Sequence, residues 1–352
     1  MDHLLENYNY HLPEHLIASR PAVPRHSSKL MIYDQRTGEV HHTSFDNIHQ
    51  FLPQNSCMVF NQSKVFPCRL RGKKSTGGSV EVFLLSLEPT DGDAYPCLVK
   101  TTKKKKIGEK YYFDGGLEAQ LVGHHEREDS GSFLVKFSTG ELLTWLEDYA
   151  MIPIPPYIRK GESDLRDRSD YQTIYAKNPG SVAAPTAGLH FTELVLSNLE
   201  SKKIDTAFVN LHVGLGTFSK VGVENIHDHK MHHESYFVDS ENLEKISSRK
   251  GSLVAVGTTS LRVLESSYNI DMNPAEMYST DIFLHPGVDV KSIKALVTNF
   301  HLPKSSLLML VSALIGREKT LELYREAIEN EYRFFSYGDG MLILLDRGEL
   351  GE

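Results

Sequence analysis

Polar loops that carry glycine and histidine recur in the C-terminal half of the sequence. One loop covers residues 180–193 and holds Thr186 and His190 among small residues. Small residues let a ligand approach the backbone, while the hydroxyl and the imidazole supply polar contacts. The same pattern fits a tight turn before a helix with Thr192 as its N-cap. We therefore keep a ligand pocket and a plain turn as equal alternatives.

A second loop, residues 210–218, places His212 between two apolar residues, with Gly214 and Gly216 beyond it. Alternation along a strand turns His212 away from the core, so a ligand can reach it. The glycines permit close approach of a ligand, but a G-x-G pair alone is not a dinucleotide fingerprint. A β-bulge explains the glycines almost as well.

A third cluster holds four histidines and a glutamate in eight positions. Its members are His227, His229, His232, His233 and Glu234. This density suggests a metal, yet the spacing matches no zinc signature such as H-E-x-x-H. We expect no metal, and instead general acid–base work or hydrogen bonding to a polar ligand by His232 and Glu234.

A fourth cluster begins where an apolar strand ends at Gly257, with Thr258, Thr259 and Arg262 at the start of a helix. Backbone N–H groups and the positive end of a helix dipole favour an anion there. The lysine of a P-loop is absent, so a carboxylate fits better than a nucleoside triphosphate. An N-cap role for Thr258 or Thr259 is expected as well, and is compatible with anion binding.

Two further loops place a titratable side chain beside a buried run. His301 follows the strand-like run ALVTNF, and Asp339 precedes the run GMLILL between two glycines. Both side chains are candidates for proton transfer. A turn aspartate explains Asp339 equally well.

The composition is that of an ordinary globular protein, with 352 residues, 40% hydrophobic and 24% charged. No run of eighteen apolar residues is present, so we expect no membrane span. The N-terminus lacks a basic region followed by an apolar one, and the three cysteines form no C-x-x-C pair. We therefore expect reduced thiols and a cytoplasmic protein.

The formal net charge is −8, but the segment from Lys64 to Lys110 has eleven Lys and Arg residues against five acidic residues. Its densest point is the run of four lysines at residues 103–106. A local basic segment can hold a polyanion on an acidic protein, because phosphate contacts come from nearby lysines. A solvated lysine turn is the alternative.

The elements that must position these loops show two different sequence patterns. Residues 64–142 contain short runs rich in Val, Leu, Phe and Tyr between glycine turns, which predicts a small antiparallel barrel. Further on, strand-like runs alternate with helical spacing, as in GSLVAVG followed by TTSLRVLESS, and this predicts an α/β body. We predict a mixed, barrel-like α/β body at 1–62 and 151–352, with an antiparallel β-barrel domain inserted at 63–150.

Taken in order, these clusters resemble one family, the S-adenosylmethionine:tRNA ribosyltransferase-isomerases of queuosine synthesis. The matching stretches are YHLPEHLIA, GGSVEVFLL, PPYIRK, DYQTIYA, GSVAAPTAGLHFT, LHVGLGTF, HKMHHESY, AVGTTSLRVLES, TNFHLPKSSLLMLVSALIG and YRFFSYGDGMLI. The resemblance implies transfer and isomerisation of the ribosyl part of S-adenosylmethionine onto 7-aminomethyl-7-deazaguanine at the tRNA wobble position. The implied products are epoxyqueuosine, adenine and methionine, with S-adenosylmethionine as co-substrate and no metal.

Such a reaction needs a base beside the sulfonium, a donor that helps adenine leave, and a neutral attacking amine. The candidates for proton transfer are His190, His212, His232, Glu234, His301 and Asp339. The candidates for binding S-adenosylmethionine are Thr186, Gly214, Gly216, Gly257, Thr258, Thr259 and Arg262. For the methionine carboxylate we favour Thr258, Thr259 and Arg262. The basic segment Lys64–Lys110 is the expected contact with tRNA, and we favour a monomer.

The chain departs from the family pattern near its N-terminus, at His26 and Lys29, and again at Gln62 and Lys64. The family has R-D-x-S-R-L at the first place and N-D-T-R-V at the second, and lysine does not reproduce a bidentate arginine contact. Two other functions therefore stay open. One is a tRNA-binding paralogue with altered catalysis, and the other is a metal-dependent hydrolase that uses the histidine cluster.

Overall fold

The computed structural model describes residues 2–90, 92–102, 104–125, 131–214, 221–249, 251–274 and 276–346. The chain forms two compact units. The first, called the body, comprises residues 1–63, 169–178 and 184–352. The second, called the barrel unit, comprises residues 64–168 and 179–183. The domain limits expected from the sequence, 63–150 for the insert, stay a prediction.

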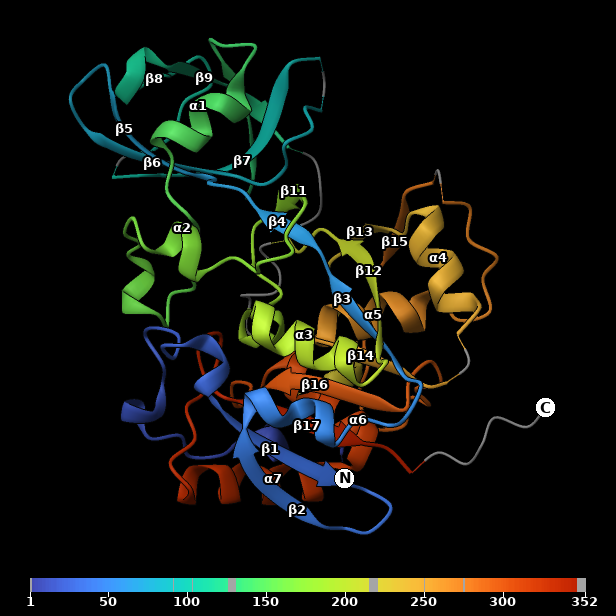
Figure 1. Ribbon diagram of the computed structural model, residues 1–352. Helices are drawn as coiled ribbons and strands as arrows, with labels where there is room; N and C mark the ends of the chain where they lie inside the picture. Colours follow the sequence, from blue (N-terminus) through green and yellow to red (C-terminus); the bar gives the residue numbers. More distant parts are fainter. Residues whose placement is uncertain are drawn as a thin grey trace. The chain divides into compact units, whose positions relative to one another are not determined.

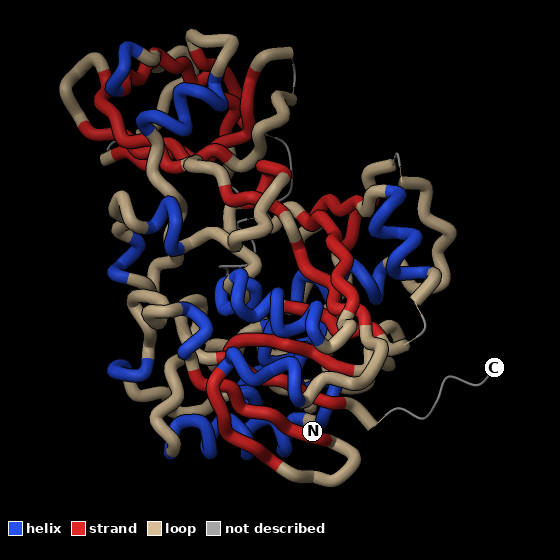
Figure 2. The backbone as a smooth tube through the Cα atoms, in the orientation of Figure 1, coloured by secondary structure: helices blue, strands red, loops and turns tan. Residues whose placement is uncertain are grey.

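A nine-stranded mixed sheet runs through the body (Figures 1 and 2). Its strands, in spatial order, are β15 (Tyr278–Thr280), β13 (Glu234–Phe237), β12 (Asp205–Leu211), β3 (Cys57–Asn61), β14 (Leu253–Val256), β16 (Ala295–Asn299), β17 (Gly340–Leu344), β1 (Lys29–Asp34) and β2 (Val40–Ser44). The four strands from β12 to β16 are parallel, whereas β17 runs antiparallel to β16 and β13 antiparallel to β12. The predicted mixed α/β body is confirmed.

The central strands are buried along their whole length because both faces of the sheet are covered. Every residue of β3, β14, β16 and β17 is buried, as expected for strands in the middle of an α/β sheet. On one face, Val254, Val256 and Val297 form a core with Val195 and Leu199 of α3. This core fixes the position of α3 on the sheet, and with it the position of the preceding turn that carries His190.

Seven α-helices are described. They are α1 (Leu142–Tyr149), α2 (Asp167–Asp170), α3 (Glu193–Ser201), α4 (Ser240–Ser247), α5 (Thr258–Ser266), α6 (Ser306–Ile315) and α7 (Arg317–Glu329). The helix predicted after the fourth cluster is therefore present as α5. Its N-cap is Gly257 with φ of 86°, a backbone conformation that favours glycine, so the expected cap by Thr258 or Thr259 is wrong. Thr192 does occupy the N-cap position of α3.

The barrel unit contains a closed antiparallel barrel, which confirms the barrel predicted from the sequence. Its strands, in spatial order, are β10 (Phe133–Phe137), β7 (Ala94–Thr101), β6 (Ser79–Leu84), β5 (Arg69–Lys74), β8 (Lys110–Phe113) and β9 (Glu118–His124). Buried and more exposed residues alternate along β6, so one face of the strand fills the interior. A separate two-stranded sheet pairs β4 (Ser63–Val65) with β11 (Asn178–Ser181).

Among the described residues, no helix combines the length and the apolar character that crossing a membrane would require.

Candidate active site

One edge of the body sheet collects the ends of six strands. The parallel strands β12, β3, β14 and β16 all finish there. The antiparallel strands β17 and β13 start there, because Asn299 pairs with Gly340 and Leu211 with Tyr236. Open α/β sheets bind ligands at the carboxyl ends of their parallel strands. This edge, which we call the polar edge, is therefore the expected place for a site.

The loops and helix starts at this edge carry most of the predicted site residues. They are His212, Gly214, Glu234, Gly257, Thr258, Thr259, Arg262, His301 and Asp339. The short helix η7 (Thr186–His190) contacts β16 and brings Thr186 and His190 to the same edge. His232 lies two residues before β13 and is exposed, and Gly216 lies outside the described residues.

Glu234 and Arg262 form a buried ion pair, in which each side chain is only 5% exposed. The Arg262 Nη1 donates to Glu234 Oε2, and the Gly214 N–H donates to Glu234 Oε1 over 3.1 Å. The Nε and Nη2 of Arg262 have no hydrogen-bond partner among the described residues. A buried donor without a partner costs about 1–3 kcal/mol or more. This guanidinium is therefore available to donate hydrogen bonds to a bound ligand.

A chain of hydrogen bonds joins η7 to the end of β16. Thr186 Oγ1 donates to Asn299 Oδ1 over 2.9 Å, and Asn299 Nδ2 lies 3.1 Å from His190 Nε2. Ser28 Oγ lies 2.8 Å from His190 Nδ1. Because the amide nitrogen can only donate, Nε2 accepts and the imidazole proton sits on Nδ1, directed at Ser28. Both ring nitrogens are therefore occupied by protein partners.

His190 is buried and uncharged at neutral pH. Its ring stacks on Phe45 with centroids 4.5 Å apart. Burial, together with the positive charges of Arg333 and Arg25, lowers the pKa of His190 to about 3. A histidine with this pKa and two satisfied nitrogens is poorly suited to take a proton near pH 7.

Asp339 is 1% exposed and binds the start of β1 to the segment before β17. Its Oδ1 accepts from the Lys29 N–H over 3.1 Å and from Arg333 Nη2 over 2.9 Å, while Oδ2 accepts from the Arg333 N–H over 2.8 Å. Hydrogen bonds from an arginine to a carboxylate are among the stronger ones and fix the orientation of the carboxyl group. The geometry favours a positioning function for this residue.

His301 is fixed through both its backbone and its ring. Its N–H donates to the Tyr324 hydroxyl over 3.0 Å, and its carbonyl accepts from the Tyr10 hydroxyl. Its Nε2 lies 2.7 Å from Thr298 Oγ1, and burial lowers its pKa to about 3. His301 is thus also neutral at physiological pH.

Two of the four departures from the family pattern have structural partners. Lys29 Nζ donates to the carbonyls of Asn330 and Glu331, just beyond the end of α7, over 2.8 and 2.9 Å. A cation is favourable there because carbonyls at a helix end are otherwise unpaired. His26 Nδ1 lies 2.9 Å from Thr192 Oγ1. These two side chains are therefore committed to the fold.

The other two departures differ in setting. Gln62 is 5% exposed and directly follows β3 at the polar edge. Lys64 belongs to the barrel unit, where its Nζ lies 3.8 Å from Glu147 Oε1. Of the four positions, Gln62 is therefore the one whose change bears on the body site.

The histidine cluster does not assemble as a ligand set. Among the described residues, no group of three or more His, Cys, Asp or Glu side chains is placed to hold a metal ion. His232 and His233 are exposed, and His233 Nε2 lies 3.8 Å from Asp281 Oδ2. Only Glu234 of this cluster is buried at the polar edge.

Three residues of the network were not singled out from the sequence: Ser28, Asn299 and Arg333. Each is the partner of a residue that was, since they contact His190 and Asp339. Asn299 lies two residues before His301 in the same polar segment, and this short spacing is the feature of the sequence that could have identified it. Nothing local marks Ser28, because its partner is 162 residues away.

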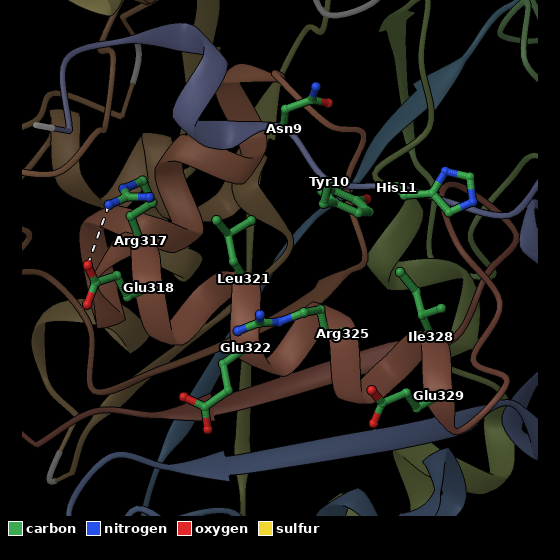
Figure 3. Close-up of a pocket in the computed structure, with 10 residues that line it drawn as sticks. All are labelled: Asn9, Tyr10, His11, Arg317, Glu318, Leu321, Glu322, Arg325, Ile328 and Glu329. Carbon is green, nitrogen blue, oxygen red and sulfur yellow. Dashed lines mark ion pairs between the residues drawn. The ribbon is translucent and has the colours of Figure 1, made fainter.

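A separate hollow of about 650 Å³ lies along one side of α7 (Figure 3). Its lining residues are Asn9, Tyr10, His11, Arg317, Glu318, Leu321, Glu322, Arg325, Ile328 and Glu329. No residue predicted for the site is among them, so the hollow and the polar edge are different features of the body.

Comparison with known proteins supports one family over nearly the whole chain. Residues 5–343 match the family model described as "Queuosine biosynthesis protein". The chain is 44% identical to the S-adenosylmethionine:tRNA ribosyltransferase-isomerase of Clostridioides difficile, over 96% of this chain and 98% of that protein. It is also 44% identical to the protein of the same name from Acetivibrio thermocellus, over 96% and 99% of the two chains.

A solved structure agrees with these relatives. The crystal structure of an S-adenosylmethionine tRNA ribosyltransferase from Thermotoga maritima is 34% identical in sequence and has a TM-score of 0.54, covering 96% of this chain and 100% of that one. A shared sequence over the full length supports common chemistry as well as a common fold. The chain therefore belongs to the queuosine biosynthesis family of S-adenosylmethionine:tRNA ribosyltransferase-isomerases.

Proposed function

We propose that the polar edge of the body is where this ribosyltransferase-isomerase holds S-adenosylmethionine and transfers its ribosyl part to 7-aminomethyl-7-deazaguanine in tRNA. The observation that carries the proposal is the buried Arg262, whose Nε and Nη2 are unpartnered among the described residues. Such a group is stable in a core only if a ligand or ordered water completes its hydrogen bonds.

The Glu234–Arg262 pair suits the methionine end of S-adenosylmethionine, which carries both an ammonium and a carboxylate. The free Nε and Nη2 of Arg262 form a fork that matches the two oxygens of a carboxylate. Glu234 supplies the opposite charge for the ammonium, so a zwitterion leaves no net charge unbalanced in the buried site. The Gly257 N–H already donates to the Val297 carbonyl, so the first N–H groups of α5 from Thr258 onward add partial positive charge beside the carboxylate.

Positioning and proton transfer divide among the remaining predicted residues. His190 and Asp339 hold the polar edge in shape, because their polar atoms are bonded to Ser28, Asn299 and Arg333. The sulfonium of S-adenosylmethionine acidifies the adjacent C–H bonds. We assign the base to His212, which is half-buried directly after β12 and two residues from Gly214. His232 is the next candidate, whereas the lowered pKa of His301, about 3 as for His190, makes His301 poorly suited to take a proton near pH 7.

The tRNA contact belongs to the barrel unit in this proposal. Several basic residues of the segment Lys64–Lys110 already have acidic partners, as Arg71 does in Glu162 and Lys74 in Glu109. Lys104 and Lys106 are exposed, and no ion pair involves either of them among the described residues. Lys103 lies outside the described residues. Exposed lysines of this kind bind phosphates and make binding sensitive to salt.

The conditions of action are part of the same proposal. All three cysteines are free and buried, which fits the reducing cytoplasm. We propose that the enzyme acts there as a monomer and without a metal. Incubation with S-adenosylmethionine and precursor-bearing tRNA in the presence of EDTA tests whether a metal is needed, and we expect full activity.

The direct test is incubation of the protein with S-adenosylmethionine and precursor-bearing tRNA. Release of adenine together with an epoxide on the base supports the proposed reaction. Adenine release without the epoxide indicates the paralogue with altered catalysis, and tRNA binding without any adenine release indicates a paralogue that has lost the reaction.

A further inference from the structure

Four aromatic rings form a continuous row on the body, in two segments beside β13 and β15. His227 lies 4.9 Å from His285 between ring centroids, and His285 lies 4.9 Å from Phe283. Phe283 in turn lies 5.3 Å from His229. We call these four residues the ring row. It combines two histidines of the predicted cluster with two residues that the sequence did not single out.

The ring row is held in shape by its backbone. The Asn225 side chain accepts from the His227 N–H over 3.1 Å and caps the short helix η9 (Ile226–Asp228). His285 Nδ1 lies 2.9 Å from the Pro286 carbonyl, which can only accept, so the ring proton sits on Nδ1. The backbone at His227 and the ring of His285 are thus fixed before any ligand arrives, which lowers the entropy cost of binding.

The row is open to solvent and lies next to the polar edge. His227 is exposed, while His229, Phe283 and His285 are half-buried. The two segments of the ring row flank β13 and β15, and these strands pair with Glu234 opposite Thr280. The ring row therefore borders the start of β13, where Glu234 lies. Burial, and after it the nearby His232, lower the pKa of His229, which favours the neutral form of that ring.

We propose that the ring row stacks unpaired RNA bases that flank the reacting nucleotide of the tRNA. This inference rests on the proposed function, since it names a second contact for the same substrate. Proteins recognise single-stranded RNA loops by stacking splayed bases on aromatic and histidine rings. Neighbouring rings of the row lie near 5 Å apart and at interplanar angles of 75°, 49° and 76°, so their planes face in different directions and can receive bases that are splayed apart.

The surroundings favour bases over phosphates as the bound groups. The exposed residues of the loop include Asp228 as well as Lys230, so the local charge is balanced and gives little attraction for a polyanion. A single adenine ring from S-adenosylmethionine would use only part of a row of four. The geometry therefore points to RNA as the occupant.

The test compares three single variants, His227→Ala, Phe283→Leu and His285→Ala, with the wild-type protein in tRNA binding at several salt concentrations. Each loss of a stacking ring should raise the Kd for tRNA about tenfold and leave the slope of log K against log salt unchanged. The KM for S-adenosylmethionine should stay within about twofold. His41→Ala, which removes an exposed imidazole near Phe51, is the matched control and should bind tRNA normally.

Two results would overturn the inference while leaving the enzyme's function intact. One is wild-type affinity for tRNA in all three variants, with wild-type protein binding and reacting as expected. The other is a raised KM for S-adenosylmethionine at normal tRNA affinity, which would place adenine on the rings. If the wild-type protein itself neither binds nor modifies tRNA, the proposed function fails instead.

Discussion

The polar edge of the body and the surface of the barrel unit use charge in opposite ways. Glu234 and Arg262 are each 5% exposed and pair in the core of the body. In the barrel unit, Arg71 and Glu162 are 44% and 57% exposed and pair in water. A buried charge depends on its partner, whereas water replaces a lost partner at the surface.

In the proposed function, this difference separates two tasks of one enzyme. The body fixes polar atoms in single positions, as reactions at a defined carbon require. The barrel unit carries charges that are individually weak and replaceable, as binding along a phosphate backbone requires. Substitutions at the polar edge should therefore affect stability and chemistry together, while substitutions on the barrel unit should affect RNA affinity alone.

The sharpest contrast is between Glu234→Gln and Glu162→Gln. The first leaves the buried Arg262 without its counter-charge, and we expect the free energy of unfolding to fall by about 3–5 kcal/mol. The second breaks an exposed pair and should cost less than about 1 kcal/mol. Urea unfolding of both variants measures this. Equal losses in the two variants would remove the distinction between the two regions.

Asn299→Ala tests whether the polar edge also depends on neutral hydrogen bonds. The variant leaves Thr186 Oγ1 and His190 Nε2 without their partner, while Ser28 still bonds His190 Nδ1, and the cost is about 1–3 kcal/mol in unfolding free energy. We also expect single-turnover adenine release to slow at least about tenfold, because η7 loses its tie to β16. Gln120→Ala, which removes one exposed hydrogen bond in the barrel unit, is the control and should change neither quantity.

The pH dependence of stability should identify His190. Its pKa is about 3 in the folded chain, against an ordinary value of 6.5, so the unfolded chain binds the proton more tightly between these pH values. The contribution of His190 to the free energy of unfolding is therefore fully present above about pH 6.5. It declines as the pH falls, by up to about 1.4 kcal/mol per pH unit. Unfolding free energies at pH 7, 6 and 5 should decline less steeply in His190→Gln. An unchanged slope would show that His190 does not titrate this way.

The smallest effect on the protein itself is expected for the double variant Lys104→Gln with Lys106→Gln. Stability should stay within about 0.5 kcal/mol, since both side chains are exposed. The slope of log K for tRNA against log salt should become shallower by about two, one for each lost phosphate contact. Lys319→Gln on α7 of the body serves as the control. A salt slope that does not change would remove the barrel lysines from the RNA contact.

The sequence predicted local features well and long-range partners poorly. The barrel strands, α5 and the histidine-bearing loops follow from periodicity and turn residues. The partner of Asp339 in β1 is 310 residues away, and that of Glu234 is 28 residues away. Such pairs depend on strand order, which places β3 between β12 and β14, and no local pattern encodes that order.

The histidine cluster shows the same limit. Its density suggested a single chemical role, but the structure separates its members. Glu234 enters the buried pair, His227 and His229 join the ring row, and His233 lies near Asp281. The second half of the row, Phe283 and His285, comes from the segment after β15. Only the pairing of β13 with β15 brings the two segments together.

The central claim is that the Glu234–Arg262 pair binds the amino-acid end of S-adenosylmethionine. The most direct test compares kcat/KM for S-adenosylmethionine and for its decarboxylated analogue, in wild type and in a Glu234→Gln, Arg262→Gln double variant of unaltered fold. We predict that wild type prefers the carboxylate-bearing substrate by about a hundredfold, in line with a charge-assisted bond of roughly 3 kcal/mol, and that the variant loses most of this preference. The same preference in both proteins would place the carboxylate elsewhere and contradict the account.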